Sequence, residues 1–298
     1  GDDRRVAGID AALVFHQPRG VPDLRALAAF CVVGLGSHAR TKILPALTAA
    51  GRPLAGVVTS NDDGAGAARR FTSLDAALAG LPRETVFFLA TPPTLHAAQA
   101  AKVLAAGSDV FVEKPAFVTR QDAESITALS GVKGPVLVEA FMYQHTLLFA
   151  RLLSYWGDER ANVRAISLRF VIPQMPPATF RSRKDISSSS LFDIGCYPLS
   201  LLRRLGIGTD TLKVTRVDHP GEPHRERLEI TGKSDGKTLF IEAGVGPAYV
   251  NEARFERDGD AVTFSPIFYG RPGVRTIVSP QRSTVLEDNN AFEAMFAI

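Results

Sequence analysis

Apolar and polar positions along the first half of the chain follow two alternating patterns. Short, almost wholly apolar runs, typical of buried parallel strands, alternate with longer segments that have helical character. The apolar runs predict strands at 28–34, 54–59, 85–90, 109–113 and 136–139. The longer segments predict helices at 37–50, 74–79, 95–106 and 121–129. This alternation predicts a parallel sheet with helices on both of its faces.

The pattern changes after about residue 140. A strand is predicted at 163–172, followed by a loop rich in Pro, Ser and Arg and by a helix at 191–205, in which Pro198 could introduce a kink. Further strands, separated by tight turns, are predicted at 228–232, 237–246, 250–257 and 261–264. We therefore predict an α/β fold with a doubly wound parallel sheet at 26–140 and an α+β domain with a largely antiparallel open sheet at 141–298. Residues 1–25 form a leader of unclear role.

The composition is that of a globular protein with two domains. The chain has 298 residues, of which 45% are hydrophobic and 22% charged, and this excludes a disordered or fibrous protein. The net charge of +3 makes no strong field, so no nucleic-acid partner is expected. No apolar run approaches the ~20 residues of a membrane span, so no membrane association is expected. Two cysteines cannot form a disulfide framework, which favours a reducing, cytoplasmic location.

A glycine-rich turn follows the first predicted strand. Residues 34–39 fit the pattern G-x-G-x-x-A, in which Gly34 permits the tight turn and Gly36 lets a pyrophosphate approach the backbone. Ala39 is small enough for the helix to pack closely on the strand, and the helix N-terminus faces the anion. The same turn places two further residues at the predicted dinucleotide site, Ser37 and His38. The alternative is a purely structural turn that contains two glycines.

The end of the second strand indicates which dinucleotide is bound. An acidic residue there, ~20 residues after the glycines, would hold the ribose hydroxyls of NAD. The chain instead has Thr59, Ser60 and Asn61. Because these are neutral, a 2′-phosphate could be held by Thr59, Ser60 and an arginine, Arg40 or Arg69. We predict NADP as the preferred cofactor; NAD remains the alternative if Asp62 or Asp63 reaches the ribose.

Lys114 lies at the carboxyl end of a predicted strand, where open α/β sheets bind their ligands. Close to a cationic nicotinamide, or desolvated by substrate, its amine could have a lowered pKa and help to move a hydroxyl proton while hydride is transferred. The alternative from this segment alone is a surface lysine ahead of a loop-forming proline.

Several motifs in order along the chain resemble one family. They are the glycine turn with 43–47, the Ala-Thr-Pro-Pro segment 90–93 with His96, the Glu-Lys-Pro segment 113–115, and Asp-x-Gly-x-Tyr at 193–197. Together, over about 30–296, the chain resembles the glucose–fructose oxidoreductase/inositol dehydrogenase/MocA family of NAD(P)-dependent oxidoreductases. The resemblance implies a Rossmann domain, a homodimer or homotetramer formed through the C-terminal sheet, and further cofactor contacts from Thr91, Pro92, His96, Glu113 and Lys114.

The resemblance also implies the catalytic residues. Lys114 would assist proton transfer and orient the substrate, Asp193 would position the substrate, and Tyr197 would act as acid or base. Positions i and i+4 project from one face of a helix, which suits the last two. Further substrate contacts are expected from Tyr143 and His145 at the domain junction and from Arg181 in the loop before the helix. No metal site is expected, because the histidines lie apart from any cysteine or carboxylate cluster.

We therefore expect an enzyme that transfers hydride between the nicotinamide and a secondary alcohol or ketone of a sugar or sugar-nucleotide-like substrate. Two alternatives remain at this point. The first is a dihydrodiol or aldose dehydrogenase of the same family. The second is a dinucleotide-binding sensor without turnover, which the serine run at 187–190 and the short C-terminal segment would suit.

Overall fold

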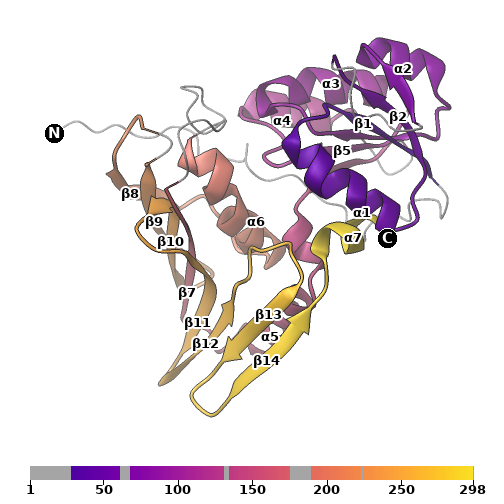
Figure 1. The fold of residues 1–298 in the computed structure, drawn as a ribbon. Coiled ribbons are helices and arrows are strands. Elements are labelled where there is room, and N and C mark those ends of the chain that lie inside the picture. The colour runs from indigo at the N-terminus through magenta and orange to yellow at the C-terminus, as the bar shows by residue number, and fades with distance from the viewer. Residues whose placement is uncertain (1–27, 61–67, 131–133, 175–188, 223–224, 298) are drawn as a thin grey trace. The chain divides into compact units, whose positions relative to one another are not determined.

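The structure, a computed structural model, describes residues 28–60, 68–130, 134–174, 189–222 and 225–297. The described chain forms two compact units. The first, the Rossmann unit, contains residues up to Met142 and the C-terminal segment from Phe292; the second, the sheet unit, contains Tyr143–Ala291. The two units confirm the predicted fold class, a parallel α/β sheet followed by a mainly antiparallel sheet with helices (Figure 1).

The Rossmann unit is built on a six-stranded parallel sheet. Its strands are β1 (Phe30–Val33), β2 (Leu54–Val58), β3 (Arg69–Phe71), β4 (Val86–Leu89), β5 (Val110–Glu113) and β6 (Leu137–Ala140). Their spatial order, β3-β2-β1-β4-β5-β6, is that of a doubly wound dinucleotide-binding sheet. The central strands β1 and β4 are buried at every position, because helices cover both faces. Strand β3, which has only three residues, was not predicted from the sequence.

Helices lie on both faces of this sheet (Figure 1). They are α1 (Leu44–Ala49), α2 (Leu74–Gly80), α3 (Pro93–Ala105) and α4 (Arg120–Thr127). Ser73 and Thr119 cap α2 and α4, each accepting a hydrogen bond from the backbone amide three residues on. A π-helical turn, Ala39–Ile43, leads from the glycine turn into α1, so the predicted helix at 37–50 is present with an irregular first turn.

A short C-terminal helix, α7 (Ala291–Phe296), completes the Rossmann unit. Phe296 is fully buried in the core that also contains Phe30 and Phe88, with ring centroids 5.3 and 5.6 Å from theirs. Arg52, itself 9% exposed, donates from Nε to the carbonyl oxygen of Phe296 at 2.7 Å. The end of the described chain is therefore part of the core around β1, which the sequence analysis did not anticipate.

The sheet unit contains an eight-stranded sheet. Its strands are β7 (Ala165–Pro173), β8 (Lys213–Asp218), β9 (Arg227–Ser234), β10 (Lys237–Gly246), β11 (Val250–Arg257), β12 (Asp260–Ser265), β13 (Gly273–Val278) and β14 (Ser283–Asp288). The order is β14-β13-β12-β11-β7-β10-β9-β8, and all neighbours are antiparallel except β7 and β10. Strands β7 and β9 to β12 were predicted from the sequence, whereas β8, β13 and β14 were not.

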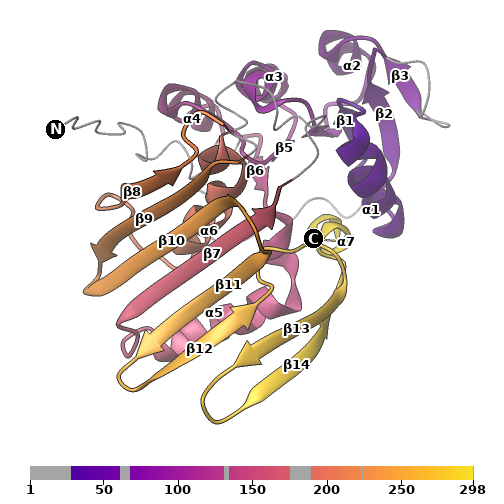
Figure 2. The same cartoon turned by 60° about the vertical axis from the view of Figure 1, so that its left-hand side comes forward.

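Helices α5 (Leu147–Glu159) and α6 (Cys196–Arg204) lie along one face of the eight-stranded sheet (Figures 1 and 2). Alternate residues of β7, namely Ile166, Leu168 and Phe170, are buried on that face. Trp156 of α5 donates from its indole nitrogen to the carbonyl oxygen of Leu205 at 2.9 Å, which joins the two helices at their ends. Helix α5 was not predicted from the sequence.

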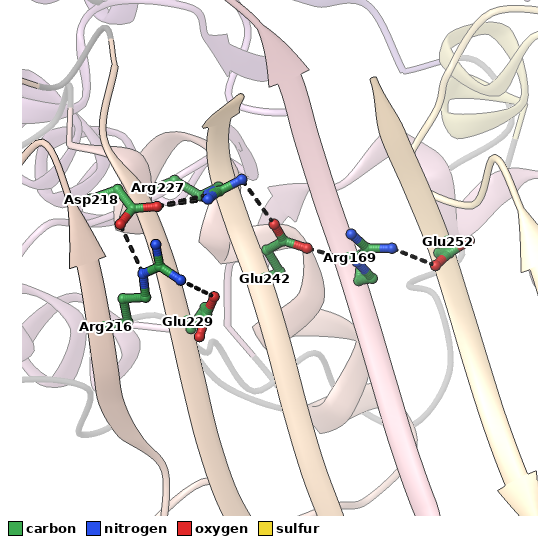
Figure 3. A network of polar contacts seen from close by, with 7 residues as sticks. All are labelled: Arg169, Arg216, Asp218, Arg227, Glu229, Glu242 and Glu252. Atoms are coloured by element: carbon green, nitrogen blue, oxygen red, sulfur yellow. Dashed lines mark hydrogen bonds and ion pairs between the residues drawn. The ribbon is translucent and has the colours of Figure 1, made fainter. Parts of the chain in front are cut away.

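The opposite face of the same sheet carries a ladder of charged side chains from five neighbouring strands. The ladder consists of Arg216, Asp218, Arg227, Glu229, Glu242, Arg169 and Glu252 (Figure 3). Its shortest contacts, both 2.7 Å, join Arg227 to Asp218 and Arg169 to Glu242. Three valines continue this face onto the β13–β14 hairpin, Val274, Val278 and Val285, which are 59%, 45% and 63% exposed.

Candidate active site

The glycine turn after β1 has the conformation that a dinucleotide requires. Gly34 has φ +90°, and a Cβ there would lie 2.9 Å from Cγ2 of Thr91 and 3.1 Å from the backbone of Ala90. Only glycine fits this position without strain. A Cβ at Gly36, in contrast, would meet nothing within 4 Å, so the backbone there borders open space. Ala39 is 1% exposed and packs in the core. These features fit a pyrophosphate placed against Gly36.

Thr59 and Ser60 follow β2, as predicted. Thr59 is 8% exposed and its amide donates to the carbonyl oxygen of Phe71 at 3.0 Å, while Ser60 is exposed. Arg70 of β3 donates to the carbonyl oxygen of Ser60 at 3.4 Å. Arg69, considered from the sequence for a 2′-phosphate, instead donates to Gly80 and lies over the ring of Phe71. Sequence reasoning missed Arg70, the guanidinium that lies at this corner; the unpredicted strand β3 brings it there.

Ser37 and Arg40 lie where the glycine turn leads into the π-helical turn. Arg40 donates from Nε to the carbonyl oxygen of Leu35 at 3.0 Å, so its guanidinium is close to the turn. The carbonyl oxygen of Ser37 accepts from the hydroxyl of Thr41 at 2.8 Å. Asp62 and Asp63, the carboxylates of the NAD alternative, lie outside the described residues.

Lys114 directly follows β5, and hydrogen bonds of Glu113 fix its backbone. The Glu113 carboxylate accepts from the amide of Lys114 at 3.1 Å and contacts Nε2 of His38 at 2.9 Å. Burial alone would raise the pKa of Glu113, but the charges of His38 and Lys114 and the hydrogen bond to His38 outweigh it, so this pKa lies below its ordinary value. An ionised Glu113 thus joins the glycine-turn helix to the lysine.

His96 joins two other loops at the same edge of the sheet. The ring is 0% exposed, with Nε2 2.8 Å from the carbonyl oxygen of Thr91 and Nδ1 3.2 Å from the carbonyl oxygens of Pro115 and Ala116. Burial holds the pKa of His96 below its ordinary value, against the effect of these carbonyls. His96 was predicted to contact the cofactor; the structure shows it buried between the backbones of two loops that border the predicted site.

Thr91 and Pro92 connect β4 to α3, at the same edge. The hydroxyl of Thr91 donates to the side-chain oxygen of Gln99 at 2.6 Å, and its methyl carbon would lie 2.9 Å from a Cβ at Gly34. Pro92 is exposed and precedes the first residue of α3. Thr91 therefore adjoins the glycine turn directly.

Glu139, at the end of β6, is a member of this site that the sequence analysis did not identify. Its side chain accepts from the amide of Ala116 at 2.9 Å, and the residue is 6% exposed. Burial is the main cause that raises the pKa of its carboxyl to about 8. The signal was present in the sequence, because Glu139 ends a buried strand in the same way as Glu113.

In the sheet unit, Asp193 and Tyr197 lie on consecutive turns of one helical segment. Asp193 is in a π-helical turn, Leu191–Gly195, and Tyr197 is in the first turn of α6. The sequence predicted a regular helix here; π-helical turns of this kind are frequent at functional sites. Asp193 and Tyr197 are 3% and 6% exposed, and the ring of Tyr197 packs edge-to-face on Phe170 at 5.2 Å. Both side chains are therefore buried in the sheet unit.

Tyr143 contacts this helical segment through Ser200. It is fully buried, and its hydroxyl lies 2.7 Å from Oγ of Ser200, which donates to the carbonyl oxygen of Tyr197 at 2.7 Å. Because the single proton of Ser200 is used in that bond, the phenol of Tyr143 donates to Ser200. Tyr143, predicted as a substrate contact, packs beside Tyr197, with their ring centroids 5.9 Å apart.

His145 is partly buried at the start of the sheet unit. Burial, with the charge of Arg204, lowers its pKa to about 4, so the ring is neutral at pH 7. Its carbonyl oxygen accepts from the side-chain amide of Asn289 at 2.9 Å. Arg181, the remaining predicted substrate contact, lies outside the described residues. Among the residues that the structure describes, no three His, Cys, Asp or Glu side chains are grouped as a metal site requires.

The chain is similar to known oxidoreductases. A family model for Gfo/Idh/MocA proteins, described as an oxidoreductase family with an NAD-binding Rossmann fold, matches residues 28–141. A dTDP-3,4-didehydro-2,6-dideoxy-alpha-D-glucose 3-reductase of Actinomadura kijaniata is 28% identical over 253 residues, covering 80% of this chain and 74% of the relative. No helix in the described ranges is long and apolar enough to cross a membrane.

Two solved structures show the same fold over most of the chain. A 3-ketoreductase from Actinomadura kijaniata, in complex with NADP and TDP-benzene, matches with a TM-score of 0.73 at 22% identity, over 90% of this chain and 87% of that one. An aldose-aldose oxidoreductase from Caulobacter crescentus, complexed with glycerol, matches with a TM-score of 0.77 at 17% identity, over 91% and 87%. The motifs and these matches agree: residues 28–141 match the model of the Gfo/Idh/MocA oxidoreductase family, and the chain is similar to a sugar-nucleotide 3-reductase over 80% of its length.

Proposed function

We propose that the protein is an NADP-dependent reductase of a carbonyl group on a sugar or nucleotide-linked sugar. The observation that carries the proposal is the position of Lys114, whose backbone is joined to the glycine-turn helix through Glu113 and His38. A lysine fixed so close to the predicted dinucleotide site is suited to act on the oxygen of a carbon that exchanges hydride. The 28% identical sugar-nucleotide 3-reductase supports this choice of substrate class.

In this proposal each residue has a defined role. NADPH, when bound, supplies hydride chemistry at the carbonyl carbon. Lys114 and Tyr197 hold and deliver the proton that the carbonyl oxygen receives, and Asp193 orients the neighbouring hydroxyl. A free phenol titrates near ~10, so an ammonium close to Tyr197 is needed to make it an effective acid. His145, neutral at pH 7, contributes a hydrogen bond to substrate, and Arg181 is proposed as a further contact.

The preference for NADP rests on the corner at the end of β2. The described residues there, Thr59 and Ser60, are neutral, and Arg70 donates to the carbonyl of Ser60. A guanidinium is a good ligand for a phosphate ester. Neither Thr59 nor Ser60 has a carboxylate that would repel the 2′-phosphate. The remaining cofactor contacts proposed are the residues of the glycine turn and of the two following loops: Gly34, Gly36, Ser37, His38, Ala39, Thr91, Pro92, His96, Glu113 and Lys114.

We also propose the organisation of the enzyme in the cell. The Rossmann unit binds the cofactor, and the sheet unit binds substrate and pairs with a second copy as a homodimer or homotetramer. In the part of the chain that the structure describes, α5 and α6 lie on one face of the eight-stranded sheet, and the ladder face carries exposed valines. Cys31 and Cys196 are buried thiols and form no disulfide, which supports a reducing cytoplasm.

The test is oxidation of NADPH and NADH over a panel of keto-sugars, free and nucleotide-linked, with Lys114→Ala beside the wild type. General acid catalysis contributes about 10²–10⁴-fold, so a loss of that order in kcat is expected for Lys114→Ala. The matched control is Lys102→Ala, an exposed lysine of the same unit that is paired with Asp75. Equal rates for wild type and Lys114→Ala would overturn the catalytic assignment.

The same assay separates the alternatives. Oxidation of free aldoses with NADP as acceptor, and no reduction of keto-sugars, would identify an aldose dehydrogenase. Tight NADPH binding with no turnover of any carbonyl or polyol would identify a sensor. A cofactor that copurifies with the protein decides between NADP and NAD directly, through its 2′-position.

A further inference from the structure

The segment that follows Lys114 obtains its hydrogen bonds from buried side chains. The amide of Ala116 donates to Glu139 at 2.9 Å, and the carbonyl oxygens of Pro115 and Ala116 both face Nδ1 of His96 at 3.2 Å. Glu139 and His96 are 6% and 0% exposed. The loop that carries the lysine is thus held by an ionisable group from β6 and another from α3.

Nearby charged groups of the Rossmann unit shift the pKa of the Glu139 carboxyl. The groups that act on it are Lys114, which favours its carboxylate, and Glu113, which disfavours it. His38 and His96 are further titratable groups near these two residues, and they contact Glu113 and the lysine loop respectively. Burial outweighs the favourable contacts, so the pKa of Glu139 is raised to about 8, and the group is mostly a neutral acid at pH 7.

We propose that Glu139 is a positioning residue for Lys114: its carboxyl holds the lysine loop through the amide of Ala116, and its ionisation stabilises the Lys114 ammonium at alkaline pH. This inference rests on the proposed function only for its catalytic consequence. Removal of the proton from Glu139 creates a carboxylate near Lys114, and the amine then holds its own proton more tightly. Lys114 therefore remains a proton donor to higher pH than it would beside a neutral group.

Glu139→Gln separates charge from geometry, because the glutamine carbonyl can still accept from Ala116 but cannot ionise. The chain offers a matched control at the other end of the same two strands. There Asp109 accepts from the amide of Val136 at 2.8 Å, also bridging β5 to β6. Asp109→Asn removes a carboxylate in the same type of bond, far along the strand from Lys114.

The primary measurement is the pH dependence of Lys114 acetylation by limiting acetic anhydride, with Lys102 in the same digest as reference. It needs neither cofactor nor substrate. At pH 9 we expect Lys114 to be labelled about three- to tenfold faster in Glu139→Gln than in the wild type, because opposite charges nearby shift a pKa by about one unit. Asp109→Asn is expected to match the wild type. Unchanged labelling of Lys114 in Glu139→Gln would overturn the proposal.

A second measurement uses the free energy of unfolding from pH 5 to 9. Since the folded pKa of Glu139 is above the unfolded value near ~4.5, its stabilising contribution is greatest below that value and decreases as pH rises toward 8. Glu139→Gln should therefore gain stability relative to the wild type over this interval, and Asp109→Asn should not. An infrared titration of the wild type should also show a protonated carboxyl that ionises near pH 8; its absence would contradict the proposal even if Glu139→Gln failed to fold.

Activity then tests the consequence. With a keto-sugar substrate, the alkaline limb of kcat should begin at lower pH in Glu139→Gln than in the wild type or Asp109→Asn. If no carbonyl is turned over but the labelling shift is present, the proposed function fails and the inference on Glu139 stands. If turnover is present and labelling is unchanged, the inference fails alone.

Discussion

At the scale of single residues, the two glycines of the cofactor turn are expected to have different roles, one in folding and one in cofactor binding. Gly34 has φ +90° and no room for a Cβ, whereas Gly36 borders open space. Gly34→Ala should destabilise the fold by about 1–3 kcal/mol through backbone strain. Gly36→Ala should leave the free energy of unfolding unchanged but weaken NADPH binding at least about tenfold, because the methyl group occupies the place of the pyrophosphate.

Urea unfolding of the apo protein and fluorescence titration with NADPH measure the two effects. Each glycine variant is the control for the other, since both changes add one methyl group to the same turn. Equal NADPH affinity for Gly36→Ala and the wild type would show that the phosphates bind elsewhere.

Short-range sequence patterns are sufficient to predict part of the candidate site. The glycine spacing and the position of Lys114 after an apolar run are short-range features, and the structure places both at the carboxyl edge of the parallel sheet. The place of Glu139 at the end of an apolar run is also a local signal, but its contact with Ala116 joins residues 23 positions apart in sequence. The burial of Tyr143 likewise depends on Ser200, which is 57 positions away. Spacing along one strand contains no information on such pairs.

At the scale of elements, the missed helix α5 had a readable signal. Thr146 accepts from the amide of Phe149 as an N-cap, and Leu148, Leu152 and Trp156 recur on one face at helical spacing. Strand β3 and helix α7 are different, because they have three and six residues. Elements so short have little pattern of their own, and packing against distant residues stabilises them. Sequence reasoning could therefore have found α5 but not β3 or α7.

Helix α7 should be essential to the stability of the Rossmann unit. Phe296 is fully buried against Phe30, Phe88 and Phe111. Phe296→Ala should cost about 3–5 kcal/mol, since it removes a large ring from a closely packed core. Leu129→Ala, at a leucine of the same unit that is 48% exposed, is the control and should change stability by less than about 0.5 kcal/mol. Thermal and urea unfolding measure both; a small effect of Phe296→Ala would mean that α7 does not pack on β1 in solution.

At the scale of the whole molecule, the net charge of +3 says little about partners, because most charges on the ladder face are satisfied within the chain. That face has three arginines against four carboxylates, arranged with alternating sign across five strands (Figure 3). Charges that are already paired can be covered by a second copy without leaving an isolated ion buried. An open sheet face of this kind is suited to a two-fold interface, in which each patch meets its own equivalent.

The proposed pairing depends most directly on the valines at the β13–β14 end of that face. Val285 is 63% exposed on its own, and its cross-strand partner on the same face is Thr276. Val285→Asp places an unpaired carboxylate in the middle of an apolar contact, which should shift a dimer to monomer in sedimentation velocity at micromolar concentration. The affinity for NADPH should be unchanged, because the glycine turn belongs to the other unit.

Leu129→Asp, an equally drastic change at an exposed leucine of the Rossmann unit, should leave the dimer intact. A wild-type protein that sediments as a monomer at all concentrations would contradict the pairing, and dissociation by both variants would place the interface elsewhere.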